Sequence, residues 1–91
     1  TNPTHFAVAL SYEPERMKAP EVTAKGADAV AFRIRAVARE HEVPVVENRP
    51  LARALYSEVA VGETIPTKHF EAVADVIGFV MRQRAAGTAR A

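Results

Sequence analysis

The stretch HFAVALSY, residues 5–12, decides the fold that we expect for this chain of 91 residues. Its Phe, Val, Leu and Tyr side chains alternate loosely with other residues, which is the pattern of a buried β-strand. A buried strand needs partners in a sheet and cover on its faces, so the interpretation of the other segments starts from it.

The two segments after this strand are expected to be a connection and a helix. Residues 13–26 contain two prolines and a glycine, which indicates a long connection. Residues 27–41 predict a helix with Asp28 in its first turn, where a negative charge suits the helix dipole. Its apolar side falls at helical spacing and consists of Ala27, Val30, Ile34, Val37, Ala38 and His41.

The second half of the chain predicts a short strand over residues 43–48 and two more helices. Pro50 suits the first turn of a helix that carries Leu55 on its apolar face. Thr67 suits the N-cap of the last helix, whose apolar stripe runs through about residue 84.

These elements predict an α/β fold, with a small central β-sheet surrounded by about four helices. One helix lies between the two expected strands, so a parallel pair with a right-handed crossover is the default. Two strands cover three helices poorly, so we expect a further strand upstream of Thr1, in a longer parent protein. Residues 1–84 are expected to form the domain, and residues 85–91 a flexible C-terminal tail.

Composition excludes several classes of function. The formal net charge of +1 gives little field to attract nucleic acid. The chain has no cysteine, which excludes disulfides, thiol catalysis and cysteine zinc sites. No stretch approaches the length of about 20 apolar residues that crosses a bilayer.

Residues 2–5, Asn-Pro-Thr-His, stand directly before the central strand and suggest backbone chemistry. In the common reaction of asparagine, the amide nitrogen of the next residue attacks the Asn side chain. Pro3 has no N–H, so that route is closed. The Asn2 side-chain nitrogen can instead attack its own main-chain carbonyl, forming a succinimide and releasing Pro3 as the leaving amine.

The neighbouring residues suit this reaction. Asn2 and Pro3 match the first two positions of a turn, which can hold the Asn2 carboxamide near its carbonyl. His5 is the nearby side chain of the type that titrates near neutral pH, and Thr4 can orient it or bind an oxyanion. An ordinary turn capped by Asn2 explains the same residues, so the chemistry alone leaves both interpretations open.

The whole sequence around this turn is more specific. Residues 2–12, 19–56 and 61–82 resemble the self-cleaving cytoplasmic C-terminal domain of the FlhB/YscU family of type III export switch proteins. The stretches AKGAD (24–28) and VVENRPLARALY (45–56) are closer to the flagellar members than to the injectisome members.

The resemblance implies cleavage between Asn2 and Pro3, with Asn2, Pro3, Thr4 and His5 as the catalytic set. Such a protein cleaves itself once and is not a turnover enzyme. The resemblance also implies a component of the flagellar export apparatus that switches export from rod- and hook-type to filament-type proteins. It places the domain at the cytoplasmic face of the bacterial inner membrane, anchored through an N-terminal region absent from this chain.

The partners implied by the resemblance are other export-gate components, exported flagellar proteins and the hook-length control protein, with no nucleic acid among them. An apolar dock for exported proteins is expected at Ala19, Pro20, Ala74 and Ile77, although Ala74 and Ile77 also suit a core. The alternatives are an injectisome homologue or a docking module that does not cleave. No cofactor or metal is expected, because His41 and His69 lack ligand neighbours in the sequence.

Overall fold

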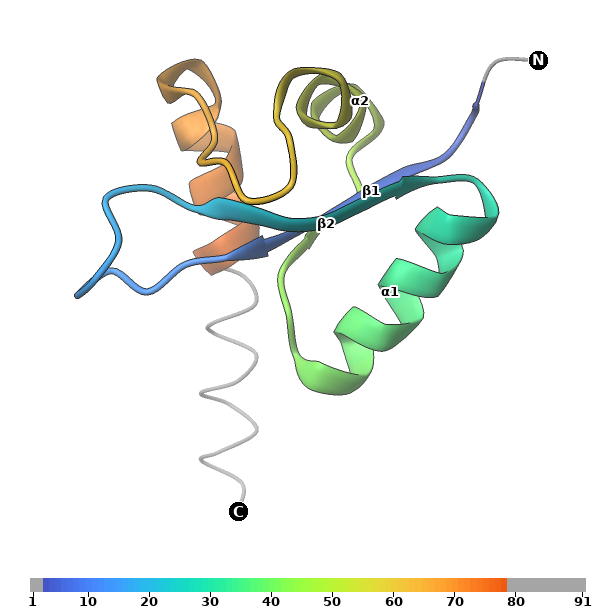
Figure 1. Ribbon diagram of the computed structural model, residues 1–91, viewed down its shortest axis with the longest axis horizontal. Helices are drawn as coiled ribbons and strands as arrows, with labels where there is room; N and C mark the ends of the chain where they lie inside the picture. The colour runs from blue at the N-terminus through green and yellow to red at the C-terminus, as the bar shows by residue number, and fades with distance from the viewer. Residues whose placement is uncertain (1–2, 79–91) are drawn as a thin grey trace.

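The computed structural model describes residues 3–78, and these form an α/β fold, as predicted (Figure 1). The elements follow in this order: strand β1 (Phe6–Ser11), strand β2 (Glu21–Ala27), helix α1 (Ala29–His41), strand β3 (Val45–Val46), helix α2 (Arg49–Glu58) and the 3-10 turn η1 (Thr67–His69). The turn η1 continues as a helix over residues 70–78. The end of the last predicted helix and the predicted tail over 85–91 lie outside the described residues.

The sheet has three strands in the order β2-β1-β3, and the strand predicted from HFAVALSY, β1, lies in the centre. Both neighbours run antiparallel to β1, so the expectation of a parallel pair was wrong. Phe6 pairs with Ala27 at one end of β1, and Val8 pairs with Val46 on the other side. A bulge opposite Ala9 and Leu10 shifts the register of β2.

The pairing differs because residues 21–27 form a strand and not part of a connection. β1 and β2 are consecutive and antiparallel, and α1 then joins β2 to β3. Since β2 and β3 both oppose β1, they run in the same direction with β1 between them. Helix α1 therefore connects β2 and β3, two parallel strands that are not paired with each other.

One face of the sheet carries the main hydrophobic core. Val8 and Leu10 of β1 pack there with Leu55 of α2 and with Val73 and Ile77 of the last helix. All but Ile77 are almost completely buried. Burial of a side chain of this size stabilises the fold by roughly 1.5–3 kcal/mol each, so this face supplies most of the stability.

Helix α1 covers the opposite face (Figure 1). Ala7 and Ala9 alternate with Val8 and Leu10 along β1 and so point to this side, where Ala31 and Ala38 of α1 are buried. Gly26 of β2 admits the close approach, because a Cβ there would lie 2.9 Å from Val30 Cβ and 3.1 Å from Ile34 Cδ1.

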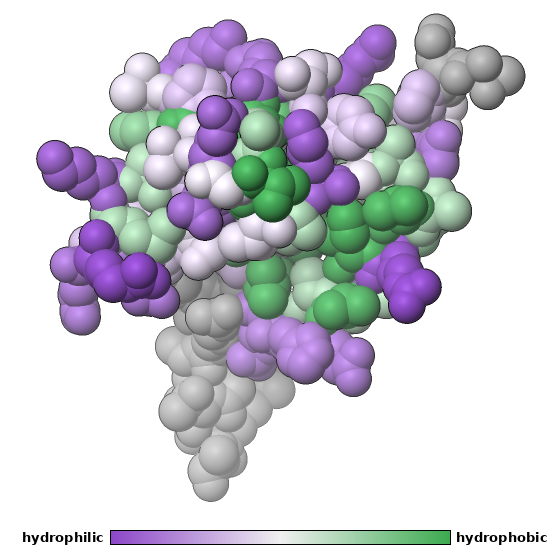
Figure 2. Space-filling model, viewed as in Figure 1, coloured by the Kyte–Doolittle hydropathy of each residue, from purple (hydrophilic) through white to green (hydrophobic). Residues whose placement is uncertain are grey.

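The predicted apolar side of α1 is only partly buried. Val30 and Val37 of that side are each at least half exposed, as is Phe32, which was not predicted as part of it, and Figure 2 shows apolar side chains gathered over this helix. The helix lies so close to Gly26 that its small residues, Ala31 and Ala38, face the sheet.

Lys25 joins β2 to the C-terminus of α2. Its Nζ donates to the carbonyl oxygens of Tyr56 and Val59, at 2.9 Å in both cases. These carbonyls lie at the C-terminus of α2, where a positive charge is favourable. Lys25 and Gly26 therefore point to opposite faces of β2, as neighbours in a strand must.

The helix starts agree in part with the sequence. Asn48 caps α2 by accepting from the Leu51 N–H at 3.1 Å, and Pro50 lies in the first turn as predicted. The last helical segment begins at Thr67, but Pro66 occupies the N-cap and no side chain caps it. Helix α1 begins at Ala29, so Asp28 is its N-cap residue and is not in its first turn.

Among the described residues 3–78, no helix has both the length and the apolar character that crossing a membrane requires.

Candidate functional site

Pro3, Thr4 and His5 lead into β1 at the end of the sheet where β2 turns into α1 (Figure 1). Pro3 and Thr4 are exposed, and His5 is half-buried. Asn2, the predicted reactive residue, lies outside the described residues. The structure therefore describes the Pro3 side of the predicted cleavage site and the groups around it.

Asp28 holds the backbone of this segment. Its Oδ1 accepts hydrogen bonds from the backbone N–H groups of Thr4 and His5, at 3.1 Å in both cases. The Asp28 N–H in turn donates to the His5 carbonyl oxygen at 2.9 Å. Three backbone groups directly after Pro3 are thus fixed by one residue that lies far away in the sequence.

The His5 ring is held on two sides. Thr4 Oγ1 lies 2.9 Å from His5 Nδ1, and Asp28 Oδ1 lies 3.8 Å from the same nitrogen. The Phe32 ring packs on the imidazole with 4.9 Å between the centroids. These contacts engage Nδ1 and one face of the imidazole ring.

Asp28 carries the negative charge of this cluster. The pKa of its carboxyl group is lowered, first by the backbone hydrogen bond from His5 and then by that from Thr4. Both bonds favour the ionised form, so the carboxylate is charged at neutral pH. A charged acceptor makes these bonds stronger than bonds to a neutral oxygen.

The backbone of Asp28 is strained. Its φ of 49° and ψ of −116° lie outside the regions that residues with a Cβ normally adopt. Strain of this kind persists only where surrounding contacts enforce it, and it is concentrated at functional sites. At Asp28 the contacts with Thr4 and His5 accompany this strained backbone.

Sequence reasoning missed this role of Asp28, although the stretch AKGAD contains it. The available signal was an Asp at the start of a helix, where N-cap residues accept backbone hydrogen bonds. Asp28 does accept such bonds, but from Thr4 and His5 and not from its own helix.

Arg35 ties α1 to the first residue of β1. Its Nη2 donates to the Phe6 carbonyl oxygen at 3.2 Å, and its guanidinium group lies 5.5 Å from the Phe32 ring centroid. Its Nε lies 3.1 Å from Glu47 Oε1 as an ion pair, without hydrogen-bond geometry. Arg35 therefore joins α1 to the start of β1 and to Glu47, which follows β3.

The four predicted docking residues have different environments. Ala19 and Ile77 are buried, Pro20 is half-buried and Ala74 is exposed. Ile77 belongs to the core cluster, and the Pro20 carbonyl oxygen accepts from the Ile65 N–H at 3.0 Å. Docking of exported proteins at these residues stays a prediction.

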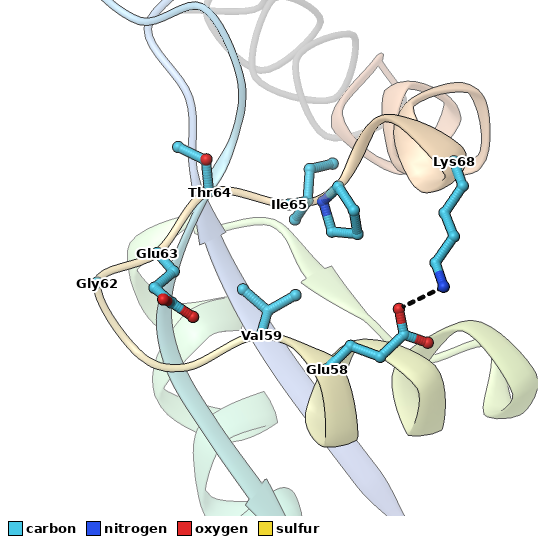
Figure 3. Close-up of a pocket in the computed structure, with 8 residues that line it drawn as sticks. Glu58, Val59, Gly62, Glu63, Thr64, Ile65 and Lys68 are labelled. Atoms are coloured by element: carbon cyan, nitrogen blue, oxygen red, sulfur yellow. Dashed lines mark ion pairs between the residues drawn. The ribbon is translucent and has the colours of Figure 1, made fainter.

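A surface hollow lies on the other side of the domain, where the segment after α2 returns along β2 (Figure 3). Glu58 and Lys68 pair across it at 2.9 Å, and Lys68 lowers the pKa of the Glu58 carboxyl group. Glu63 accepts from the Ala60 N–H at 2.9 Å. Glu58 and Lys68 are therefore engaged with each other and Glu63 with the backbone, and these contacts hold the segment after α2 in place.

Within residues 3–78, no group of three or more His, Asp or Glu side chains is placed to hold a metal ion. His69 lies 3.3 Å from Glu58, beside Lys68, and His41 lies at the far end of α1. His41 and His69 therefore lie in different parts of the described fold.

Comparison with known proteins identifies relatives over most of the chain. Residues 1–80 match the FlhB HrpN YscU SpaS family. The flagellar biosynthetic protein FlhB of Bacillus subtilis is 48% identical over 84 residues, which are 92% of this chain and 23% of that protein. The FlhB protein of Salmonella typhimurium is 50% identical over 93 residues, covering 99% of this chain and 24% of its own length. The chain thus spans about a quarter of these relatives' length.

Solved structures show the same fold. The cytoplasmic domain of FlhB from Shewanella putrefaciens superposes with a TM-score of 0.79 at 45% identity, covering 94% of this chain and 67% of that one. The PscU C-terminal domain superposes with a TM-score of 0.75 at 38% identity, covering 86% of this chain and 99% of that one. The antiparallel sheet and the helices on its two faces are therefore those of the C-terminal cytoplasmic domains of these proteins.

Proposed function

Because the chain belongs to the FlhB HrpN YscU SpaS family, we propose that it cleaves itself between Asn2 and Pro3 and acts in the flagellar type III export apparatus. The observation that carries the proposal is the Pro3-Thr4-His5 segment, held by Asp28 at the start of the central strand. Pro3 itself blocks the competing attack by a backbone nitrogen.

The proposed reaction is an intramolecular acyl transfer. The Asn2 side-chain nitrogen attacks the main-chain carbonyl carbon of Asn2 and loses one proton. A new C–N bond closes a five-membered succinimide, and the C–N bond to Pro3 breaks. Pro3 nitrogen gains a proton and leaves as the amine of the new N-terminus. The reaction needs no outside reactant, so proximity supplies most of the acceleration.

His5 is proposed as the group that moves the proton. Its Nδ1 is bound to Thr4 Oγ1 at 2.9 Å, which fixes the ring and leaves Nε2 for transfer. Thr4 is proposed to orient this ring. The Phe32 ring on the imidazole supports the same function, since it limits rotation of the His5 side chain.

Cleavage is proposed to be a single event that changes the export machine. The nucleophile ends within its own product, so one chain cleaves once and no turnover follows. Relatives named flagellar biosynthetic protein support a place in flagellar assembly. We propose that the cleaved domain switches export from rod- and hook-type to filament-type proteins, at the cytoplasmic face of the inner membrane, through contacts with other export components.

The test uses the chain with an affinity tag ahead of Thr1, purified at neutral pH. We expect two bands on a denaturing gel, and intact masses that place the cut between Asn2 and Pro3. Asn2→Ala should give one band, since it removes the nucleophile. His5→Ala should slow cleavage by ~100-fold, the lower end of the usual contribution of a general acid or base.

Two outcomes would contradict these expectations. A wild-type chain that stays in one band, and whose mass shows the same uncut backbone as Asn2→Ala, would overturn the cleavage proposal and favour a docking module. A His5→Ala rate equal to the wild-type rate would remove His5 from the mechanism and leave cleavage in place. Thermal unfolding of each variant serves as the control for folding.

A further inference from the structure

Asp28 joins the connection between β2 and α1 to the segment of Thr4 and His5, although it lies outside the motif of residues 2–5. It follows β2 and precedes α1, and it reaches the segment that leads into β1. One carboxylate oxygen accepts from both Thr4 N and His5 N, and the Thr4 hydroxyl approaches the same oxygen at 3.5 Å. No other described side chain is bonded to the backbone of Thr4 or His5.

We propose that Asp28 is a positioning residue for scission of the Asn2–Pro3 bond and acts through the amides of Thr4 and His5. This inference rests on the proposed self-cleavage. The two amides stand directly after Pro3, so holding them restricts the backbone around the bond that breaks. They also fix the base of the His5 side chain.

The strained backbone of Asp28 supports this role. Asp28 and Glu42, at the two ends of α1, are the non-glycine residues with positive φ among residues 3–78. A glycine would adopt either conformation without backbone strain. At position 28 the carboxylate offsets the strain by binding Thr4 and His5. The backbone strain and the hydrogen bonds of the carboxylate therefore affect stability in opposite directions at this residue.

That opposition gives a sharp test with four tagged chains: wild type, Asp28→Gly, Asp28→Asn and Glu42→Gly. Asp28→Gly removes the carboxylate and relieves the backbone, so we expect cleavage slower by ~10- to 100-fold without a fall in Tm. Asp28→Asn keeps an oxygen that can accept both amides, so we expect it to slow cleavage by less than about tenfold. Glu42→Gly changes the other non-glycine residue of positive φ, which lies in the left-handed region at the far end of α1, and it should cleave at the wild-type rate.

Cleavage is followed on denaturing gels at a temperature at which thermal unfolding shows every variant to be folded. A merely structural role would predict that cleavage follows Tm, and that Asp28→Asn cleaves no faster than Asp28→Gly. Equal rates for Asp28→Gly and wild type would overturn the role of Asp28 while leaving self-cleavage intact. A wild-type chain that stays whole would overturn self-cleavage, and the role of Asp28 with it.

Discussion

The two faces of the sheet are built from different side chains. On the α2 face, Val8, Leu10 and Leu55 are fully buried in one continuous aliphatic core. On the α1 face, small residues meet at close range, and larger ones such as Phe32 are left half exposed. The site segment, with His5 and Asp28, lies at the end of this second face.

From this difference we expect the α2 face to determine the stability of the fold and the α1 face to affect the alignment of the site segment. Aliphatic burial is proportional to the area removed from water, so the α2 face dominates the free energy of unfolding. The α1 face has smaller buried side chains, but it fixes a short distance between α1 and β2. Gly26 is packed directly against Val30 and Ile34, so the helix lies against the backbone of the strand. Helix α1 starts directly after Asp28, and the pairing of Phe6 with Ala27 places Asp28 beside Thr4 and His5.

The largest expected effect is on the α2 face. Leu55→Ala removes a side chain with no exposed surface and should lower the free energy of unfolding by ~2–5 kcal/mol. Denaturant unfolding measures this loss. At temperatures where the variant is still folded, cleavage should proceed at the wild-type rate, since Leu55 lies on the face opposite α1.

Leu51→Ala is the matched control, because Leu51 lies on the same helix but is only partly buried against the core. It should cost clearly less stability than Leu55→Ala. Equal losses for the two variants would contradict the expectation that the loss of stability follows burial. A cleavage rate that falls in Leu55→Ala while the protein remains folded would contradict the separation of the α2 face from the site.

A smaller effect is expected on the α1 face from Gly26→Ala. The new Cβ would overlap Val30 Cγ1 and lie 3.1 Å from Ile34 Cδ1, so α1 must shift away from β2. Overpacking of this kind should cost ~1–3 kcal/mol in denaturant unfolding. Because α1 starts directly after Asp28, this variant should also slow cleavage, which Leu55→Ala should not do.

Val30→Ala provides the control as a double-mutant cycle. It removes the nearest contact atom, Val30 Cγ1, and should recover part of the stability lost in Gly26→Ala. Strictly additive losses would show that the contact between Gly26 and Val30 is not the cause. Cleavage at the wild-type rate in Gly26→Ala would separate the α1 distance from the site.

The sequence predicted the elements that have a strong local pattern. Strand β1, helices α1 and α2 and the position of Pro50 were confirmed, because apolar spacing and proline preference act within one segment. Strand β2 was missed, since Pro20 and Gly26 are typical of connections. Gly26 lies in the strand because α1 packs directly against it, and this contact cannot be recognised from the residues next to Gly26 in the sequence.

The site was predicted in the same uneven way. Thr4 and His5 could be selected from the motif, and the structure brings both to Asp28. Asp28 lies far from them in the sequence, and only the pairing of Phe6 with Ala27 places it beside them. A residue whose role depends on strand register cannot be recognised before the strand β2 is known.

The smallest expected effect is the acid dependence of the Asp28 contact. The pKa of its carboxyl group in the folded chain is below 3.8, its ordinary value, because His5 N–H and Thr4 N–H donate to it. A group whose pKa is lowered by folding adds stability that is fully present above the unfolded value and is lost as pH falls through the folded value. The contribution should therefore be constant at neutral pH and disappear below pH 3.8.

Thermal unfolding of wild type and Asp28→Asn across this range measures the contribution as a difference. The difference is needed because Glu13 and Glu58 also have lowered carboxyl pKa values, through Arg16 and Lys68 respectively, and titrate in both chains. We expect the two Tm curves to converge as the acid limit is approached. Curves that stay parallel through this range would show that the charge of Asp28 adds nothing to folding, and that its bonds to Thr4 and His5 serve alignment alone.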